Sequence, residues 1–334
     1  MTIKDVAKQC SVSPSTVSRV LSGDIKAASR QTQRRIWDAV HQLGYQPNPN
    51  AQRLKSGVPA AQRATQEIVC ICRAADSLIN PFFTALMHAA EITAYERKYA
   101  LHFISTAAGS DLSALARDSA ANAVLILGRV QSDELSQLQM RFQHIVYTGL
   151  QDLPYEIDQV ISRGDRAART ALTHLIELGH RKICYIGGTR DEQRYQAYCE
   201  TMREYDLPIL PGSTVSTDFT PGQGYEAAQQ LLVQKRDFSA IFCANDTLAI
   251  GVLKALKDAH RRVPDAISLV SIDDLETARY LSPMLTTVHI PIAEMGTTAV
   301  KTLIDRIEDR RQIPLKIELP NRLIERDSCA PCGR

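Results

Sequence analysis

The sequence predicts an all-α helix-turn-helix head at the N-terminus, followed by an α/β body built on parallel sheets. Three observations predict this fold class. Capped, amphipathic helical segments fill the first 46 residues. From Glu67 onward, short apolar runs alternate with helical segments, which is the pattern of parallel strands covered by helices on both faces. With 334 residues, the chain is also too long for one ordinary domain.

Caps and apolar spacing indicate the first and third helices of the head. Thr2, followed three residues later by Asp5, resembles a capping box, and residues 10–12 make a turn. Ser29 can cap a third helix that ends near Gly44. The apolar face of that helix consists of Ile36, Val40 and Leu43.

The second helix is predicted within the stretch SVSPSTVSRVLSG, residues 11–23. Ser13 can cap it, and Pro14 suits its first position because the missing N–H of proline costs nothing there. Its apolar residues stand at helical spacing and are Val17, Val20 and Leu21. The hydroxyls and Arg19 therefore face outward. Three short helices with a tight turn between the first two form a helix-turn-helix.

The charge of the head points to a polyanion. Residues 1–66 hold ten Lys and Arg against three Asp, giving +7, whereas the whole chain carries only +2. The second helix of a helix-turn-helix places its N-terminal residues against base edges in the major groove of DNA. We expect base contacts from Pro14, Ser15 and Arg19, and phosphate contacts from Thr16 and Ser18.

The segments TIKDVAKQCSVSPSTVSRVLSG and LGYQPNPNAQRLKSG resemble the head and hinge of the LacI/GalR family of bacterial repressors. The resemblance implies a DNA-binding domain at 1–46, a hinge helix and linker at 47–66, and an effector-binding core at 67–334. One departure is Ser11, where the family commonly has glycine or asparagine. If the turn needs a positive φ there, serine adds strain of about 1 kcal/mol.

The hinge segment is too short to form a stable helix alone, so we expect it to fold on DNA. In the family, two hinge helices pair across a dimer and a leucine enters the minor groove; Leu54 matches that leucine. Such a wedge kinks the duplex. The other hinge residues assigned to DNA are Asn48, Ala51 and Lys55. The alternative is that Leu54 is a linker residue packed on the body.

The body resembles the family's two-lobed, periplasmic-binding-protein-like core. We expect lobe 1 at about 67–159 and 291–318, and lobe 2 at about 160–290 and 319–330. Its strands are predicted at the runs EIVCICR, ALHFIST, AVLILG, HIVYTG, KICYIGG, AIFCAND and ISLVSID. Ligands of parallel sheets collect at the carboxyl ends of strands, so the residues after these runs are the candidates.

Four residues after these strands match effector contacts of the family. Arg194 matches an arginine that holds effector hydroxyls, Asn245 and Asp246 match an asparagine-aspartate pair, and Asp273 matches the first of two paired acids. An arginine and a carboxylate suit vicinal hydroxyls, because each hydroxyl can donate to one and accept from the other. The alternative is loop support or helix capping, above all for Asp246 and Asp274.

Two arginines are compatible with an anionic effector as an alternative. Arg163 and Arg166 stand where many relatives carry an acid or asparagine near the effector, and they could admit a carboxylate or phosphate. The interpretation that we favour is that they pair with Asp165 or face solvent.

Other function classes lack their motifs. The sequence has no nucleophile elbow, P-loop, metal-binding spacing or dinucleotide fingerprint, so we predict no enzyme, catalytic residue, metal or cofactor. The one C-x-x-C, Cys329 to Cys332, has no second pair or nearby histidine. We expect the eight cysteines to be free and buried. No apolar run approaches the roughly 20 residues of a membrane span, and we expect a cytoplasmic protein with no membrane partner.

These observations predict a sequence-specific DNA-binding regulator, a repressor of a carbohydrate-utilisation operon that a sugar-like effector releases from its operator. The alternative is a regulator of the same type that responds to an anionic ligand or uses its ligand as corepressor. The resemblance further implies a homodimer joined through lobe 1. A coiled-coil tetramer is not expected, because the C-terminal segment ERDSCAPCGR has no leucine heptads.

Overall fold

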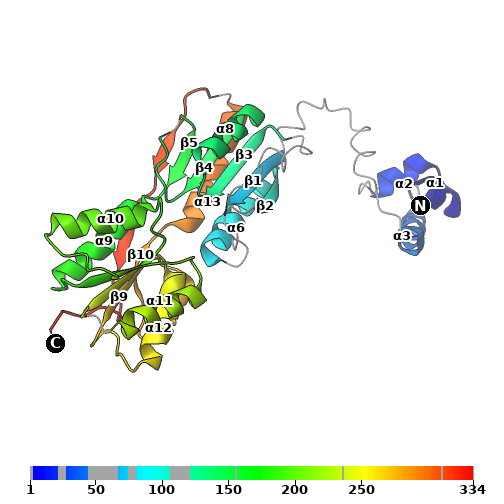
Figure 1. Cartoon of the computed structure of the whole chain (residues 1–334). Coiled ribbons are helices and arrows are strands. Elements are labelled where there is room, and N and C mark those ends of the chain that lie inside the picture. The colour runs from blue at the N-terminus through cyan, green and yellow to red at the C-terminus, as the bar shows by residue number, and fades with distance from the viewer. Residues whose placement is uncertain are drawn as a thin grey trace. The chain divides into compact units, whose positions relative to one another are not determined.

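The computed structural model (Figure 1) divides the chain into two compact units, residues 1–62 and 63–334. Each unit is described by itself. The structure describes residues 3–21, 28–43, 67–73, 80–105, 121–154, 156–234, 237–309 and 311–333. The hinge residues predicted to contact DNA lie outside this part of the chain: Asn48, Ala51, Leu54 and Lys55.

The three predicted helices of the head are confirmed. They are α1 (Ile3–Gln9), α2 (Pro14–Leu21) and α3 (Arg30–Leu43). Ser13 Oγ accepts a hydrogen bond from Thr16 N at 3.1 Å, and Ser29 Oγ accepts one from Thr32 N at 3.3 Å, so both predicted caps are present. The core of the head contains Val6, Val17, Ile36 and Val40.

The turn between α1 and α2 requires a positive φ at Ser11, the condition under which the sequence predicted strain. Ser11 has a φ of 51°, in the left-handed region where a side chain is strained. Arg35 of α3 holds the turn, because its guanidinium donates to Cys10 O at 2.9 Å. Cys10 Sγ in turn lies 3.3 Å from Arg35 O. These two contacts tie α3 to the start of the turn at Cys10.

The body contains two six-stranded sheets, which define its two lobes. Lobe 1 has the strand order β11-β5-β4-β3-β1-β2, with bounds β1 Glu67–Arg73, β2 Ala100–Ser105, β3 Ala123–Gly128, β4 His144–Gly149, β5 Asp158–Ile161 and β11 Lys316–Glu318. Lobe 2 has the order β12-β10-β9-β8-β6-β7, with bounds β6 Ile183–Gly187, β7 Thr214–Ser216, β8 Ala240–Cys243, β9 Ser268–Asp273, β10 Thr286–His289 and β12 Arg322–Ile324. The predicted parallel pairing is confirmed, except that edge strand β12 runs antiparallel to β10.

The chain crosses between the lobes three times, after β5, after β10 and after β11. The first crossing follows Ile161, the last residue of β5, which pairs with Gly149 of β4. The other two follow His289 of β10 and Glu318 of β11.

Helices cover both faces of each sheet. In lobe 1, α8 (Ser132–Arg141) packs on one face, and α6 (Pro81–Glu96) with α13 (Ile292–Glu308) packs on the other. The helices of lobe 2 are α9 (Gly164–Glu177), α10 (Gln193–Glu204), α11 (Pro221–Val233), α12 (Asp246–Asp258) and the short η1 (Glu276–Arg279). Every residue of β3, β6, β8 and β9 is buried, which explains their continuous apolar runs.

Two glycines set the close packing of α11 on α12. A Cβ on Gly251 would lie 1.8 Å from Pro221 O, and one on Gly224 would lie 2.2 Å from Leu248 O. The two helix backbones therefore touch directly. This contact fixes the N-terminal end of α12, where Asn245 is the N-cap.

The cysteines follow the prediction only in part. All eight are free. The expectation of burial holds for Cys10, Cys70, Cys72, Cys184 and Cys243, but Cys199 and Cys329 are half-buried and Cys332 is exposed. Cys332 differs because it lies in the C-terminal segment, after the last strand. None of the described helices has both the length and the apolar character needed to cross a membrane.

Candidate functional site

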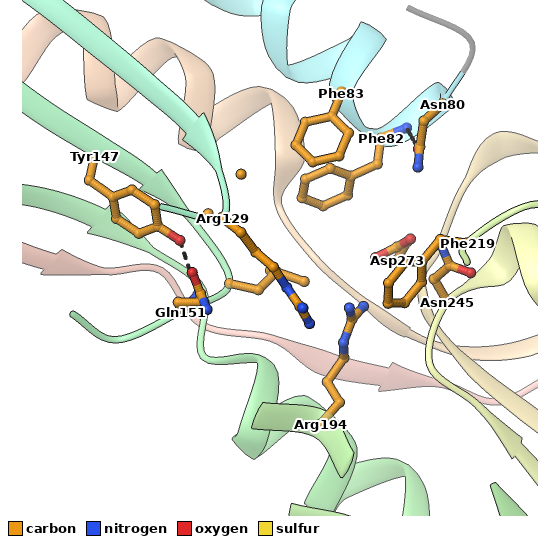
Figure 2. Close-up of a pocket in the computed structure, with 13 residues that line it drawn as sticks. Asn80, Phe82, Phe83, Arg129, Tyr147, Gln151, Arg194, Phe219, Asn245 and Asp273 are labelled. Atoms are coloured by element: carbon orange, nitrogen blue, oxygen red, sulfur yellow. Dashed lines mark hydrogen bonds between the residues drawn. The ribbon is translucent and has the colours of Figure 1, made fainter. Parts of the chain in front are cut away.

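A cavity lies between the two lobes at the carboxyl ends of their strands (Figure 2). It has a volume of about 140 Å³, similar to cavities of about 150 Å³ that accept one six-membered ring. Lobe 1 contributes Asn80, Phe82, Phe83, Gly128, Arg129, Tyr147, Gly149, Leu150 and Gln151, and lobe 2 contributes Arg194, Phe219, Asn245 and Asp273. Three of the four predicted effector contacts are therefore brought together.

Arg194 is the second residue of α10 and is held from two sides. Its Nε and one terminal nitrogen donate to the Glu192 carboxylate at 2.8 and 3.0 Å, and the other terminal nitrogen donates to Ala244 O at 2.8 Å. The guanidinium also stacks on Phe219, 4.9 Å from the ring centroid. Within the described residues these bonds use three of the five N–H donors of an arginine. The remaining donors are available to a ligand.

Asp273 ends β9 at the wall of the cavity. It has a φ of 124°, a strained value for a residue with a side chain. Its side chain is buried, and its Oδ1 has no hydrogen-bond partner among the described residues. Burial raises the pKa of Asp273 well above its usual range; the Asp246 carboxyl raises it further, and Arg194 opposes the rise. A strained, buried acceptor facing a cavity is typical of a binding site.

Asn245 has two roles in this geometry. Its Oδ1 caps α12 by accepting a hydrogen bond from Leu248 N at 3.0 Å. Because an asparagine amide also carries two N–H donors, the same side chain can donate to a ligand. Figure 2 shows Asn245 beside Asp273 and Phe219 at one side of the cavity.

Asp246 does not line the cavity, so its predicted contact with the effector is corrected to loop support. Its buried carboxylate accepts hydrogen bonds from Ser271 Oγ at 2.5 Å, Thr287 Oγ1 at 2.7 Å and Leu275 N at 2.7 Å. Burial raises the pKa of Asp246 to about 6, although these bonds oppose the rise. Asp246 thus ties the loop after β9 to α12.

Asp274 also supports the loop. Its carboxylate lies 3.0 Å from His289 Nδ1 and accepts a hydrogen bond from Arg326 at 2.5 Å. These contacts agree with the alternative that the sequence left open for this residue.

Arg163 and Arg166 lie outside the cavity. The interpretation that they pair with Asp165 or face solvent is confirmed, since Arg163 pairs with Asp165 and the Arg166 side chain is 62% exposed. Arg163 donates to Asp165 at 2.5 and 2.8 Å and to Asp152 at 3.0 Å. Arg166 pairs with Glu318 at 2.5 Å. Neither guanidinium faces the cavity as an anion site.

The sequence analysis assigned no effector contact to Arg129 or to the phenylalanines that line the cavity, Phe82, Phe83 and Phe219. Arg129 follows β3 directly, so the rule that ligands collect at the carboxyl ends of strands would have marked its position for inspection. It forms an ion pair with Glu192, the same carboxylate that holds Arg194. Phe82 and Phe83 meet edge to face, with ring centroids 5.3 Å apart. Their stretch, INPFF, follows a strand, but no sequence signal placed Phe219 opposite them.

The predicted DNA-contacting side chains of the head lie on α2. Pro14, Ser15 and Arg19 are exposed, and Thr16 is half-buried. Ser13 Oγ lies 2.7 Å from Ser15 Oγ and 2.8 Å from Thr16 Oγ1, so the hydroxyls form one cluster at the N-terminal end of the helix. The side chain of Ser18 is outside the described part. Which of these residues contacts bases stays a prediction.

Comparison with known proteins identifies the family. The model for bacterial regulatory proteins of the lacI family matches residues 2–48, and the model for a periplasmic binding protein-like domain matches residues 172–329. The HTH-type transcriptional repressor PurR of Yersinia pestis strain Pestoides F is 31% identical over 343 residues, covering 98% of this chain and 97% of that protein. The chain belongs to the LacI family.

Solved structures of LacI-family regulators share this fold. The CelR regulator in complex with cellobiose is 26% identical with a TM-score of 0.72, and the match covers 98% of this chain and 99% of that one. A LacI-family regulator from Enterococcus faecium with bound ribose is 25% identical with a TM-score of 0.71, covering 80% and 100%. This LacI-family protein is a DNA-binding transcriptional repressor with an effector-binding core, as the sequence predicted.

Proposed function

We propose that this protein holds operator DNA through α2 and releases it when a sugar-like effector binds between the lobes. The observation that carries the proposal is the convergence of Arg194 and Asp273 on one cavity. Arg194 brings N–H donors, and Asp273 brings an oxygen with no hydrogen-bond partner among the described residues. A sugar hydroxyl donates and accepts at once, so this pair matches its chemistry. The cellobiose and ribose in the two related structures support the same ligand class.

The cavity walls fit one sugar ring. Phe82 and Phe219 face it from different lobes, and their apolar surfaces suit the C–H faces of a ring, while polar groups at the edge fix its orientation. Asp273 is the one carboxylate lining the cavity in the described part of the chain, and no histidine lines it. We therefore infer a binding role and not acid-base catalysis.

An anionic effector is the second candidate, because Arg129 and Arg194 both face the cavity. Glu192 lies against both guanidinium groups and offsets one of the two positive charges. This compensation favours an uncharged ligand. A ligand shifts the equilibrium between two conformations toward the one that it binds more tightly. A corepressor would bind the DNA-binding conformation more tightly, whereas an inducer would bind the released conformation more tightly.

We further propose that the protein is a homodimer joined through lobe 1. Large apolar side chains are exposed on α6 and β2 of that lobe: Ile92 is 46%, Tyr95 81% and Phe103 39% exposed. Exposed apolar surface of this kind marks interaction sites. Replacing Tyr95 with Asp should shift the protein toward the monomer in light-scattering chromatography.

The test of the proposed function is a thermal-shift screen of the purified full chain against neutral sugars and sugar phosphates. A ligand at 100 times its Kd stabilises the folded state by about 2.7 kcal/mol, which a melting curve resolves. An operator sequence selected from random duplexes then allows DNA affinity to be measured with and without each hit. Stabilisation by a neutral sugar together with weaker operator binding supports the proposal, and stabilisation only by sugar phosphates contradicts the sugar class.

A further inference from the structure

A second hollow of about 720 Å³ opens directly beside the ring-sized cavity. The two share Arg129 and Gln151, which line both. From lobe 1 the second hollow is lined by residues 130–133, where α8 begins, and from lobe 2 by Arg190 and Asp191 in the loop after β6. A ligand that occupies the first cavity can therefore extend into the second without leaving the cleft between the lobes.

The size of the first cavity limits how much of a ligand it can hold. Its volume of about 140 Å³ holds one ring, so a ligand with two rings has to place one of them elsewhere. The second hollow adjoins the first at Arg129 and Gln151, which line both. Gln151 Oε1 is buried there and has no hydrogen-bond partner in the described part of the chain. This oxygen can accept a hydrogen bond from a ligand hydroxyl.

The charges of the second hollow argue against an anion. Apart from Arg129, which pairs with Glu192, its charged residues are Arg190 against Asp133 and Asp191. With Arg129 held by Glu192 and Arg190 paired with Asp191, the lining offers a phosphate no uncompensated cation. Ser132 and Gln151 add uncharged polar groups. Hydroxyl groups, which bond to carboxylates and amides without adding charge, fit this lining.

We propose that the effector is an uncharged glycoside of two sugar units, one in the ring-sized cavity and the other in the second hollow, joined between Arg129 and Gln151. The inference rests on the proposed function, since it takes the first cavity as the site of a sugar ring. It adds a second subsite and excludes a phosphorylated extension.

The experiment compares neutral disaccharides with their own monosaccharides by isothermal titration of the full chain, using glucose with cellobiose and with maltose, and galactose with lactose. Glucose 6-phosphate is the charged probe. We expect one disaccharide to bind at least ten times more tightly than its monosaccharides, and the sugar phosphate to bind no more tightly than glucose.

Two variants fill the second hollow from opposite lobes, Ser132→Trp and Arg190→Trp; both positions are exposed. Each should reduce the affinity of the disaccharide to that of the monosaccharide and leave the monosaccharide unchanged. Met140→Trp is the matched control, because Met140 is exposed on the same helix α8 but does not line the hollow. Unchanged melting temperatures verify that the variants fold.

The outcomes separate the two proposals. If a monosaccharide binds as tightly as every disaccharide, or if both tryptophan variants keep the disaccharide affinity, the second subsite is wrong and the proposed function stands. Tighter binding of glucose 6-phosphate than of all neutral probes overturns the uncharged class. If no sugar binds at all, the proposed function fails together with its extension.

Discussion

Arg129, after the last residue of β3, and Glu192, at the N-cap of α10, form an ion pair that joins the two lobes beside the effector cavity. The Glu192 side chain is only 5% exposed and also receives the Nε–H of Arg194 at 2.8 Å. One carboxylate thus positions an arginine from each lobe. An effector that binds Arg194, as we propose, therefore contacts a group of three charged side chains that joins the two lobes.

Glu192→Gln should weaken effector binding by about 30-fold or more. The amide leaves two guanidinium groups close together without a compensating charge, and loss of one partner of a buried charge pair costs roughly 2–5 kcal/mol. Isothermal titration measures the change. Glu204→Gln is the control, because Glu204 lies on the same helix in an exposed ion pair with Arg169. Equal affinities of the wild type and Glu192→Gln would show that the ion pair does not position the site.

The sequence predicted the residues that the chain order itself brings to the site. The rule that ligands collect at the carboxyl ends of parallel strands indicated the stretches to inspect, and the resemblance to the family singled out Arg194, Asn245 and Asp273 within them. The role of Asp246 was beyond that rule. It adjoins Asn245 in sequence, yet its side chain turns inward to Ser271 and Thr287.

The fold was also predictable from patterns in the sequence, and the features that could not be predicted have physical causes. Burial on both faces produces continuous apolar runs that reveal parallel strands. The meeting of Phe82 with Phe219 depends on how two lobes pack, which no local pattern encodes. The direction of β12 and the end of β5 also depend on pairing with distant strands. The minor-groove role of Leu54 stays a prediction.

Asp246 should make stability depend on pH. Its pKa is raised to about 6 in the folded protein, above the ordinary value of an unfolded aspartate, so the folded state binds the proton more tightly. The resulting stabilisation is present at low pH and is lost as the pH rises through about 6. Relative to Asp246→Asn, the wild type should lose up to about 1.4 kcal/mol per pH unit in this range.

Urea unfolding followed by circular dichroism between pH 4 and 7 measures this difference. Asp237→Asn serves as control, because Asp237 is 84% exposed in its ion pair with Lys182, and should show no such trend. A constant difference between the wild type and Asp246→Asn across the range would refute the raised pKa.

Gly251→Ala should destabilise lobe 2. The added Cβ would overlap Pro221 O, so α11 and α12 must move apart, and overpacking of this kind costs about 1–3 kcal/mol. Gly222→Ala, on α11 with nothing within 4 Å of its added Cβ, should be neutral or slightly stabilising. Thermal unfolding of both variants checks the contrast; a Gly251→Ala protein as stable as Gly222→Ala would contradict it.

Arg19→Ala should reduce sequence discrimination. Arg19 is exposed on α2 among the predicted base contacts, and removal of one base-contacting arginine costs about 1–3 kcal/mol for the cognate site. Affinity for random duplex should change far less. Arg34→Ala, an exposed arginine on α3, provides a charge-matched control. Binding of selected and random duplexes at several salt concentrations tests this prediction, which fails if both variants lose discrimination equally.

The central claim is that a sugar-like effector held by Arg194 and Asp273 releases the operator. Fluorescence anisotropy of labelled operator, titrated with the sugar from the screen, tests it in the wild type and in Asp273→Asn. The amide replaces a buried acceptor oxygen with a donor, and leaving a buried polar group without its hydrogen-bond partner costs about 1–3 kcal/mol. The account predicts unchanged operator affinity and release only at an at least tenfold higher sugar concentration; release of Asp273→Asn at the wild-type concentration would contradict it.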